Sequence, residues 1–364
     1  MIIYNLLAFK KNNSGAGKFA LNSLSYLSNF DDSVIILTHL TPTDFSIAFD
    51  DFNDFDRFKF IQFKFCKNPI LRIAFETVFL TLYLKFKFTK GIFYCPIPFF
   101  SFLKWRSFKY ISTVHDLTPF RVGNKYGIVK QTYVKWITKA SVYFSDKIIT
   151  VSEFSKNELI SFFSERIVNI NVLYNVIPYS EEEFIPIKNK VLFFVGNIHE
   201  GKNLVRLIDG FELFCDKYDD SYELHLIGKR EYNSDVVFRK VKNSKRHNKI
   251  MLKGFVSKKT LLEYYKKSSG MVFPSINEGF GIPIIEALKY KCPMSIANYS
   301  VFPEVAGDCA FYFDPYNIRE IADSMNQLIN DKERLNCKIS LYESQLKKFA
   351  VNINKFKEII YQND

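Results

Sequence analysis

The feature that most constrains the fold is an alternation of short apolar runs with helical stretches, which occurs twice along the chain. The first series opens with an apolar run at Ile2–Ala8, a helical pattern at Lys18–Leu27 and a second apolar run at Val34–Thr38. Further strands are expected at 92–94, 110–114, 147–151 and 169–173. Strands that alternate with helices predict a parallel sheet whose two faces are covered.

The alternation stops at Pro178–Lys190, an acidic, proline-containing segment without a clear period, which we interpret as a linker. It restarts at Val191–Val195, whose letters VLFFV are typical of a buried strand. The later strands are expected at 224–227, 250–252, 271–273 and 294–297, and the helices at 204–214, 260–267, 282–290 and 318–329. The sequence therefore predicts two α/β domains joined near residue 180. The cleft between two such domains is the expected ligand site.

The formal charge of +12 is concentrated in one segment. Residues 57–139 contain sixteen Lys and Arg but only two acids, and aromatic residues are interleaved with them, as in FKFIQFKF (58–65) and YLKFKFTK (83–90). This mixture suits peripheral contact with an anionic membrane. The alternative is a solvated basic face beside ordinary core phenylalanines. No nucleic-acid-binding motif is present, so nucleic acid is not an expected partner.

Neither a membrane span nor a cysteine site is expected. The most membrane-like stretch, Leu71–Phe88, includes four charged residues, which disfavours a spanning helix. The six cysteines form no Cys-x-x-Cys pair and lack metal-ligand spacing. Free thiols in a reducing cytoplasm are the expectation.

The densest motif is FPSINEGFGIPIIEAL at 273–288, in which a strand ends, a polar loop follows and a helix begins near Pro283. Glycines before a helix let backbone N–H groups approach an anion, and the helix N-terminus adds partial positive charge. Glu278 and Glu286 flank this turn and could accept hydrogen bonds from sugar or ribose hydroxyls. The alternative is a tight turn between two surface glutamates.

Three weaker motifs also stand at predicted strand ends. In FFVGNIHEGKNLVRL (193–207), Lys202 could place a point charge on a phosphate, or could be a solvent-exposed lysine in a capping turn. Gly15 and Gly17 form a flexible loop ahead of the first helix, without the spacing of a P-loop. His115 and Asp116 follow the strand that ends at Val114, where either a catalytic or a structural histidine would fit.

Taken together, these motifs resemble the family 4 retaining glycosyltransferases. The resemblance runs from SGAGKF to FPEVAGDCAFYFDP (302–315), and its most specific part is Glu278–Glu286. Supporting segments in the same order are TVHDLTPF, TVSEFSKNEL, LYNVIP, VGNIHEGKNL and LHLIGK. The resemblance implies the GT-B fold, with two Rossmann-like domains whose parallel sheets face an interdomain cleft. Residues 1–178 would bind the acceptor and 179–345 the nucleotide sugar, and a C-terminal helix in 346–364 would pack back on the first domain.

The resemblance also implies a role for each site residue. Glu286 would bind the ribose hydroxyls, Glu278 the hydroxyls of the donor sugar, and Lys202 the departing diphosphate. Gly17 would approach the phosphates from the first domain, and His115 would lie beside the sugar and the acceptor. The other expected donor-binding positions are Gly15, Gly196, Asn197, Gly279, Phe280, Gly281 and Ile282. No cofactor or metal ion is expected.

Two positions depart from the family pattern. Gly201 stands where relatives usually have an arginine, so half of a cationic clamp is missing, and Arg206 or Lys229 could compensate. The Gly-x-Pro that follows the signature helix is Lys291-Cys292-Pro293, which could affect base preference.

The expected activity is transfer of a sugar with retention, from a nucleotide sugar to a saccharide acceptor that is lipid-linked. Bacterial surface polysaccharide assembly of the O-antigen or capsule kind would suit a cytoplasmic enzyme at the inner face of the cell membrane. GDP-mannose is the first expectation for the donor, followed by UDP-linked N-acetylhexosamines and dTDP-rhamnose. The alternatives are a GT-B sugar-nucleotide epimerase and a non-catalytic, donor-binding scaffold.

Overall fold

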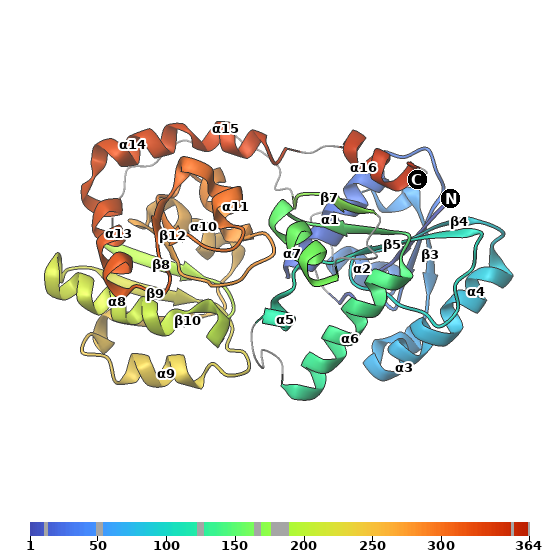
Figure 1. Ribbon diagram of the computed structural model, residues 1–364, viewed down its shortest axis with the longest axis horizontal. Coiled ribbons are helices and arrows are strands. Elements are labelled where there is room, and N and C mark those ends of the chain that lie inside the picture. The colour runs from blue at the N-terminus through green and yellow to red at the C-terminus, as the bar shows by residue number, and fades with distance from the viewer. Residues whose placement is uncertain are drawn as a thin grey trace. The chain divides into compact units, whose positions relative to one another are not determined.

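The computed structural model describes residues 1–10, 14–48, 54–121, 127–163, 169–175, 189–350 and 353–362, which form two compact units (Figure 1). Unit 1 comprises residues 1–117, 132–176 and 351–364, and unit 2 comprises 118–131 and 177–350. The expected domain boundary at 178 and most of the expected linker lie outside the described residues.

Unit 1 is built on a seven-stranded sheet in the order β3-β2-β1-β4-β5-β6-β7. Every ladder is parallel, as predicted. The strands are β1 (Ile2–Asn5), β2 (Val34–Thr38), β3 (Phe58–Gln62), β4 (Gly91–Cys95), β5 (Phe108–Thr113), β6 (Lys147–Thr150) and β7 (Ile170–Val172). The sequence reading missed β3, because an edge strand of alternating Phe and Lys is only partly buried. It also extended β1 to Ala8, whereas that strand ends at Asn5.

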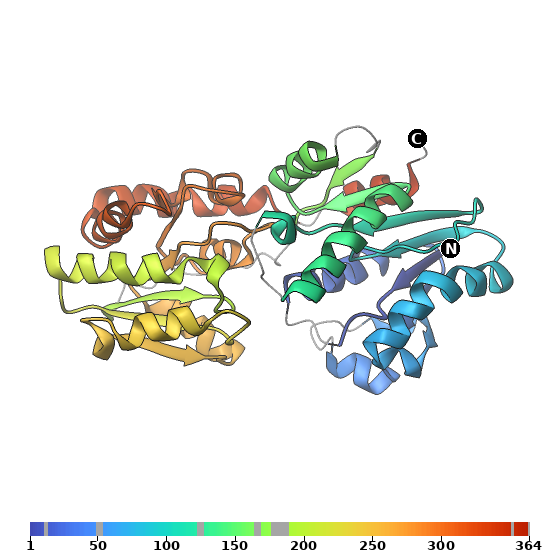
Figure 2. The same ribbon diagram turned by 60° about the horizontal axis from the view of Figure 1, so that its bottom comes forward.

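The helices of this part of the chain are α1 (Gly15–Leu27), α2 (Pro42–Ala48), α3 (Pro69–Ala74), α4 (Leu80–Lys87), α5 (Thr118–Arg121), α6 (Ile128–Phe144), α7 (Glu153–Phe163) and α16 (Ile353–Tyr361). A π-helical turn, η3 (Phe75–Phe79), joins α3 to α4, so residues 69–87 form one helical rod (Figures 1 and 2). Within the described ranges, no helix is both long and apolar enough to span a membrane.

The C-terminal helix α16 belongs to unit 1 and covers part of its core. Phe356 is fully buried, and its ring packs against those of Tyr26, Phe30 and Tyr94. The buried Lys147 at the start of β6 donates hydrogen bonds to the carbonyl oxygens of Ile359 and Gln362, at 3.1 and 2.8 Å. A cation at the C-terminal end of a helix stabilises the helix dipole.

Unit 2 has a six-stranded parallel sheet in the order β10-β9-β8-β11-β12-β13. Its strands are β8 (Val191–Val195), β9 (Glu223–Ile227), β10 (Ile250–Gly254), β11 (Gly270–Phe273), β12 (Met294–Ala297) and β13 (Phe311–Phe313). Besides α5, its helices are α8 (Leu204–Lys217), α9 (Asp235–Lys242), α10 (Lys258–Lys267), α11 (Ile282–Lys289), α12 (Phe302–Ala306), α13 (Ile318–Asn330), α14 (Lys332–Ser340) and α15 (Tyr342–Lys347). The predicted strands are present, and the three-residue β13 was missed.

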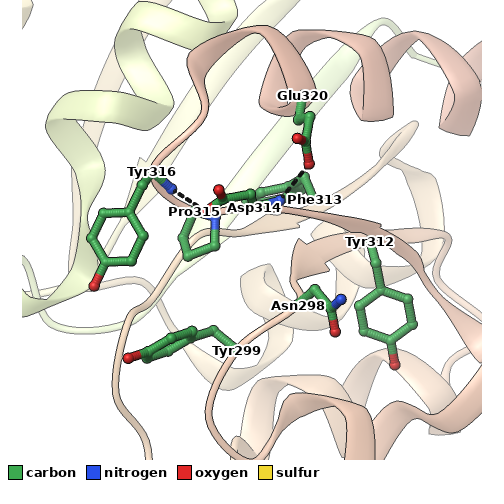
Figure 3. A pocket seen from close by; sticks show the side chains of 8 residues that line it. All are labelled: Asn298, Tyr299, Tyr312, Phe313, Asp314, Pro315, Tyr316 and Glu320. Atoms are coloured by element: carbon green, nitrogen blue, oxygen red, sulfur yellow. Dashed lines mark hydrogen bonds between the residues drawn. The ribbon is translucent and has the colours of Figure 1, made fainter.

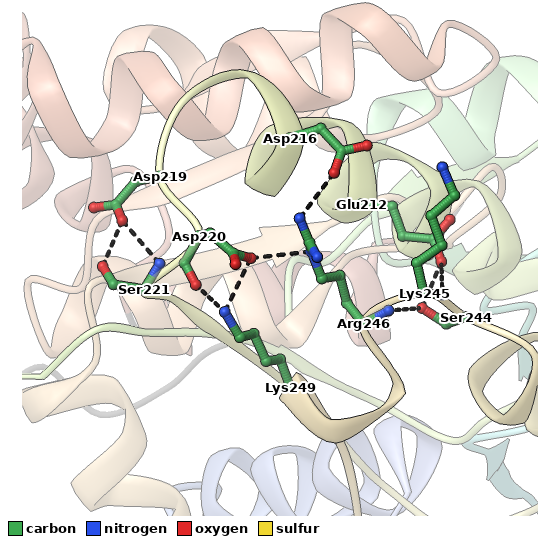
Figure 4. Close-up of polar contacts among 9 residues, drawn as sticks. All are labelled: Glu212, Asp216, Asp219, Asp220, Ser221, Ser244, Lys245, Arg246 and Lys249. Carbon is green, nitrogen blue, oxygen red and sulfur yellow. Dashed lines mark hydrogen bonds and ion pairs between the residues drawn. The ribbon is translucent and has the colours of Figure 1, made fainter.

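Charged side chains link the segment after α9 to the C-terminal half of α8 and to the turn that follows it (Figure 4). Arg246 contacts the carboxylates of Asp216 and Asp220 at 2.9 and 3.0 Å, and Lys249 reaches Asp220 at 2.9 Å. On α8, Glu212 accepts hydrogen bonds from the Ser244 hydroxyl and from a backbone N–H. These contacts secure the chain just before it enters β10.

Candidate active site

The predicted phosphate-facing residues of unit 2 stand at the carboxyl end of its sheet. Gly196 follows β8 with a φ of +151°, and Gly228 follows β9 with a φ of +149°, so both have backbone conformations that favour glycine. A Cβ atom on Gly228 would lie 1.9 Å from the carbonyl oxygen of Gly196. The two strand ends can therefore approach only without a side chain at position 228, which was not among the predicted site residues.

Lys202 and Glu278 form an ion pair, although 76 residues separate them in the sequence. Lys202 lies in the turn after β8 and Glu278 in the loop after β11, and their side chains are 13% and 20% exposed. Asn203 holds the two loops together. It adopts a left-handed conformation, and its amide donates to the carbonyl oxygens of Pro274 and Pro315 at 3.2 and 2.7 Å. The fold thus brings together the two unit 2 side chains selected as catalytic.

Helix α11 begins directly after the glycine turn. Gly281 is its N-cap with a φ of +84°, and Pro283 lies in its first turn. Because no side chain caps the helix, its first amides have the geometry that could bind an anion. Gly279 and Ile282, both expected donor-binding positions, flank this turn. Phe280 is buried, and its ring packs against Phe349.

Glu286 is oriented by a residue that the sequence reading did not select. The hydroxyl of Tyr265, on α10, donates a hydrogen bond of 2.8 Å to the Glu286 carboxylate. Burial and the adjacent carboxylate raise the pKa of Tyr265 well above its ordinary value, so this hydroxyl keeps its proton. Tyr265 therefore fixes the direction of the Glu286 carboxylate.

The backbone of Glu278 is also held by a residue that was not selected. Its N–H donates to the Ser300 hydroxyl at 3.2 Å, and that hydroxyl donates to the Glu278 carbonyl oxygen at 3.1 Å. Asn197, at the end of β8, donates from its side-chain amide to Glu231 at 2.6 Å. The Ser300 contacts hold the backbone of Glu278, a catalytic candidate. The hydrogen bond to Glu231 turns the Asn197 amide toward a surface carboxylate.

The turn that contains Gly201, where relatives usually have an arginine, is closely packed. The Gly201 N–H donates to His199 Nδ1 at 3.2 Å, and its carbonyl oxygen accepts from the N–H of Ile276 at 3.4 Å. Arg206 donates to Asn203, and its guanidinium lies 5.2 Å from the centre of the Tyr316 ring. Lys229 lies over the ring of Phe255 at 4.9 Å. Both cations therefore rest on aromatic rings.

Beside Arg206, an open pocket of about 320 Å³ lies beyond the ends of β12 and β13 (Figure 3). Tyr299 and Tyr316 form one side, with their ring centres 6.0 Å apart. Asp314, which also lines the pocket, accepts from the N–H of Tyr316. This pocket is built from the FYFDP segment, which the resemblance covered without assigning it a role.

Unit 1 contains the remaining predicted residues, Gly15, Gly17 and His115. The two glycines lie inside α1, not in a loop ahead of it, because Ser14 caps the helix and accepts from the Gly17 N–H at 3.0 Å. The ring of Phe19, one turn along α1, packs edge-on against His115 at 5.1 Å. The start of α1 and the end of β5 are thus close together.

The hydrogen bond of His115 defines its tautomer. Its Nε2 lies 2.8 Å from the carbonyl oxygen of Pro96, which can only accept, so Nε2 carries the proton and Nδ1 is the acceptor. Burial lowers the pKa of His115, which keeps the ring neutral at neutral pH. A neutral imidazole with a fixed tautomer can accept a hydrogen bond from a hydroxyl group.

The chain is similar to known glycosyltransferases. Residues 177–341 match the family model of the glycosyl transferases group 1. O-antigen chain mannosyltransferase B of Escherichia coli is 28% identical over 242 residues, which cover 63% of this chain and 64% of that protein. O-antigen chain mannosyltransferase RfbU of Salmonella typhimurium is 29% identical over 231 residues, which cover 60% and 63%. The chain thus spans slightly less than two thirds of each relative.

The fold has close counterparts among solved structures. HepE of Anabaena, crystallised with UDP and glucose, superposes with a TM-score of 0.70 over 98% of this chain and 97% of that one, at 13% sequence identity. The match extends through both units, whose two parallel sheets are those of the GT-B fold. Residues 177–341 are thus similar to the glycosyl transferases group 1, and the two units have the GT-B fold.

Proposed function

We propose that the protein transfers a mannosyl group, with retention, from GDP-mannose to a saccharide acceptor in bacterial O-antigen assembly. The donor sugar and the pathway rest on the names of the two mannosyltransferases to which the chain is similar. The observation that carries the proposal is the ion pair of Lys202 and Glu278 beside the open N-terminus of α11. This arrangement offers positive charge for a diphosphate and a carboxylate for sugar hydroxyls.

In the proposed reaction, the bond between the sugar C1 and the diphosphate oxygen breaks, and the bond from C1 to the acceptor oxygen forms on the same face. The acceptor's proton passes to the departing diphosphate. Lys202 and the amides of α11 stabilise the negative charge that develops on this group. Throughout the reaction, Glu278 binds hydroxyls of the donor sugar, and the carboxylate of Glu286 binds those of the ribose. The protein acts by positioning and charge stabilisation.

Because protein groups supply the positive charge, we propose that transfer needs no metal ion. Treatment with EDTA is expected to leave the initial rate unchanged, and added Mg²⁺ or Mn²⁺ is expected not to raise it. A rate that falls with EDTA and recovers with one of these ions would contradict a metal-free reaction.

A thermal-shift screen against GDP-, UDP-, dTDP- and ADP-sugars tests the donor. A ligand at about 100 times its Kd stabilises the folded state by about 2.7 kcal/mol. GDP-mannose is expected to stabilise the wild type and to have a smaller effect on Glu286→Ala. Product analysis by NMR then reports the anomeric configuration of any new linkage. An epimerised nucleotide sugar would favour the epimerase instead. Donor binding without turnover would favour the non-catalytic scaffold.

We further propose that segment 64–90 of unit 1 contacts an anionic membrane, which would suit a lipid-linked acceptor. The side chains of Ile70, Phe79 and Phe86 are 77%, 58% and 83% exposed. Lysines 64, 67, 85, 87 and 90 are exposed in the same segment. Exposed aromatic and aliphatic groups can insert at the interface while the lysines bind anionic headgroups.

Co-sedimentation with vesicles tests this contact. Binding to phosphatidylglycerol vesicles is expected to exceed binding to phosphatidylcholine vesicles and to fall in Phe79→Ser/Phe86→Ser. Phe255→Ser is a matched control, because this phenylalanine of unit 2 is 65% exposed but lies outside the segment. Equal binding by both variants would contradict the assignment.

A further inference from the structure

A second pocket, of about 200 Å³, lies in unit 1 between the helical rod, α6 and the segment that follows β4. Its charged lining residues are Arg72 and Glu76 from the rod, and its other walls include Phe99, Phe100 and Tyr133. Sites for drug-sized ligands usually measure about 300–1,000 Å³. This smaller pocket therefore suits a single ring-sized group.

The π-helical turn places a carboxylate in this apolar setting. Glu76 lies in η3, and its side chain is only 12% exposed. One of its oxygens accepts a hydrogen bond of 2.8 Å from the side-chain amide of the buried Asn5. Burying a carboxylate is costly, and π-turns occur frequently at functional sites. Burial raises the pKa of Glu76, although Arg72 and Asn5 oppose this effect.

Arg72 compensates Glu76 only loosely. Its Nη1 lies 3.7 Å from the second oxygen of Glu76, which is longer than a hydrogen bond. A hydroxyl group placed beside both could donate to the carboxylate while a neighbouring hydroxyl accepts from the guanidinium. A phosphate would be repelled by Glu76, and a purely apolar group would leave the charges without compensation. A ring with hydroxyl groups on its edge and carbon on its faces satisfies both the charged and the aromatic walls.

The pocket is also connected to His115. The carbonyl oxygen of Pro96 accepts the hydrogen bond of His115, and the next two residues, Ile97 and Pro98, line the pocket. A group bound there would thus lie near the histidine that is expected to face the acceptor. We propose that this pocket binds a sugar ring of the acceptor, with Glu76 and Arg72 hydrogen-bonded to its hydroxyls. This assignment rests on the proposed glycosyltransfer.

The fluorescence of Trp136 offers a test that does not require turnover. The chain has two tryptophans, and the Trp136 ring lies 5.4 Å from that of Phe100 in the pocket wall. In a Trp105→Phe background, methyl glycosides of mannose, glucose, galactose, rhamnose and N-acetylglucosamine are titrated separately. At least one is expected to change the fluorescence saturably, and Glu76→Gln is expected to weaken its binding about tenfold or more, as for loss of a hydrogen bond to a charged group.

The matched control is Glu158→Gln, which alters another buried glutamate of unit 1, on α7. Its sugar titration is expected to equal that of the background protein, and thermal melts establish that both variants are folded. If no glycoside changes the fluorescence, or if Glu76→Gln binds as well as the control, the sugar site is wrong. A thermal-shift measurement with GDP-mannose on the same variants distinguishes the two failures. If only the sugar site is wrong, GDP-mannose still stabilises the wild type. If the proposed function is wrong, GDP-mannose does not stabilise even the wild type.

Discussion

At the residue scale, Lys202 is the side chain on which the proposed chemistry depends most. Lys202→Met is expected to lower kcat about 100- to 1000-fold, because it removes one group that stabilises the leaving diphosphate. Because the ion pair is largely buried, the substitution also leaves the Glu278 carboxylate without its partner, and the free energy of unfolding should fall by up to about 3–5 kcal/mol. Steady-state kinetics and urea unfolding measure the two effects.

Lys190→Met is the control for this experiment. Lys190 also pairs with a carboxylate, that of Asp219 at 3.3 Å, but it precedes β8 and thus lies at the opposite end of the strand from Lys202. Its removal should leave kcat unchanged. A loss of rate in Lys202→Met no larger than in the control would show that the lysine does not act on the leaving group.

Tyr265 permits a finer test, because its hydroxyl has its shorter hydrogen bond with Glu286 and only a longer one, of 3.5 Å, with the Pro283 carbonyl oxygen. Tyr265→Phe removes the hydrogen bond that orients this carboxylate, which is worth about 0.5–1.5 kcal/mol. The KM for the donor should rise roughly 2- to 13-fold, with a smaller change in kcat. Tyr264→Phe is matched to it, since the neighbouring hydroxyl contacts His225 at 2.9 Å instead. Similar donor KM values in both variants would contradict the positioning role.

The contrast between Lys202 and Tyr265 shows which site residues can be predicted from the sequence and which cannot. Lys202 and Glu278 each follow a predicted strand within a local motif, and their pairing is consistent with strand ends that meet at one edge of a sheet. Tyr265 stands in the last turn of α10 and acquires its role from a residue 21 positions away. Helical periodicity assigns such a tyrosine to a face but does not identify its partner.

At the element scale, the crossing of α8 and α13 depends on Gly210. A Cβ atom there would lie 2.5 Å from Cγ2 of Ile321 on α13. Gly210→Ala gains roughly 1 kcal/mol of helix propensity but forces the helices apart, which typically costs about 1–3 kcal/mol. We expect net destabilisation in urea unfolding. Adding Ile321→Ala should make the double variant more stable than the sum of the single effects, and strict additivity would exclude the clash.

Because of Glu212, the stability that comes from the contacts between α8 and the segment after α9 should depend on pH. Burial opposes its ionisation, but the Ser244 hydrogen bond and the charge of Lys240 hold its pKa below the ordinary value. A lowered folded-state pKa adds stability above the unfolded-state pKa, and this stability is lost as the pH falls through the folded-state value. Glu212→Gln should therefore destabilise by about 1 kcal/mol at neutral pH. At about pH 3 the difference from wild type should close, and a difference that persists there would exclude the charge as its cause.

Several elements could not be predicted because their stability comes from distant contacts. The π-turn η3 has no local sequence signal, and it is recognised only from the hydrogen bonds of the rod. The edge strand β3 is stabilised by its parallel pairing with β2, which starts 24 residues earlier. By contrast, the long apolar strands β2 and β8 were predicted from their letters alone, since almost every side chain in them is buried.

At the scale of the whole molecule, the chain leaves unit 1 and returns to it at its C-terminal end. Helix α16 fills the unit 1 core with Phe356 and binds Lys147, whose acceptors lie more than 200 residues away. Nothing in the sequence near Lys147 indicated that a lysine would be buried in a parallel sheet. Because unit 1 includes residues after 350, cutting the chain once between the two sheets does not yield a complete unit 1.

Lys147→Met tests how strongly the hydrogen bonds of Lys147 hold α16 on unit 1. The substitution keeps an apolar stem but removes the donor to two carbonyl oxygens, and hydrogen bonds to a charged group are worth about 1.5–3 kcal/mol. Hydrogen exchange of the α16 amides should accelerate accordingly, while the amides of α8 in unit 2 should exchange as in wild type. Lys109→Met is the matched control, because Lys109 also reaches the Gln362 carbonyl but from an exposed position. If both variants leave α16 equally protected, the aromatic contacts of Phe356 hold the helix, and the buried lysine is not its anchor.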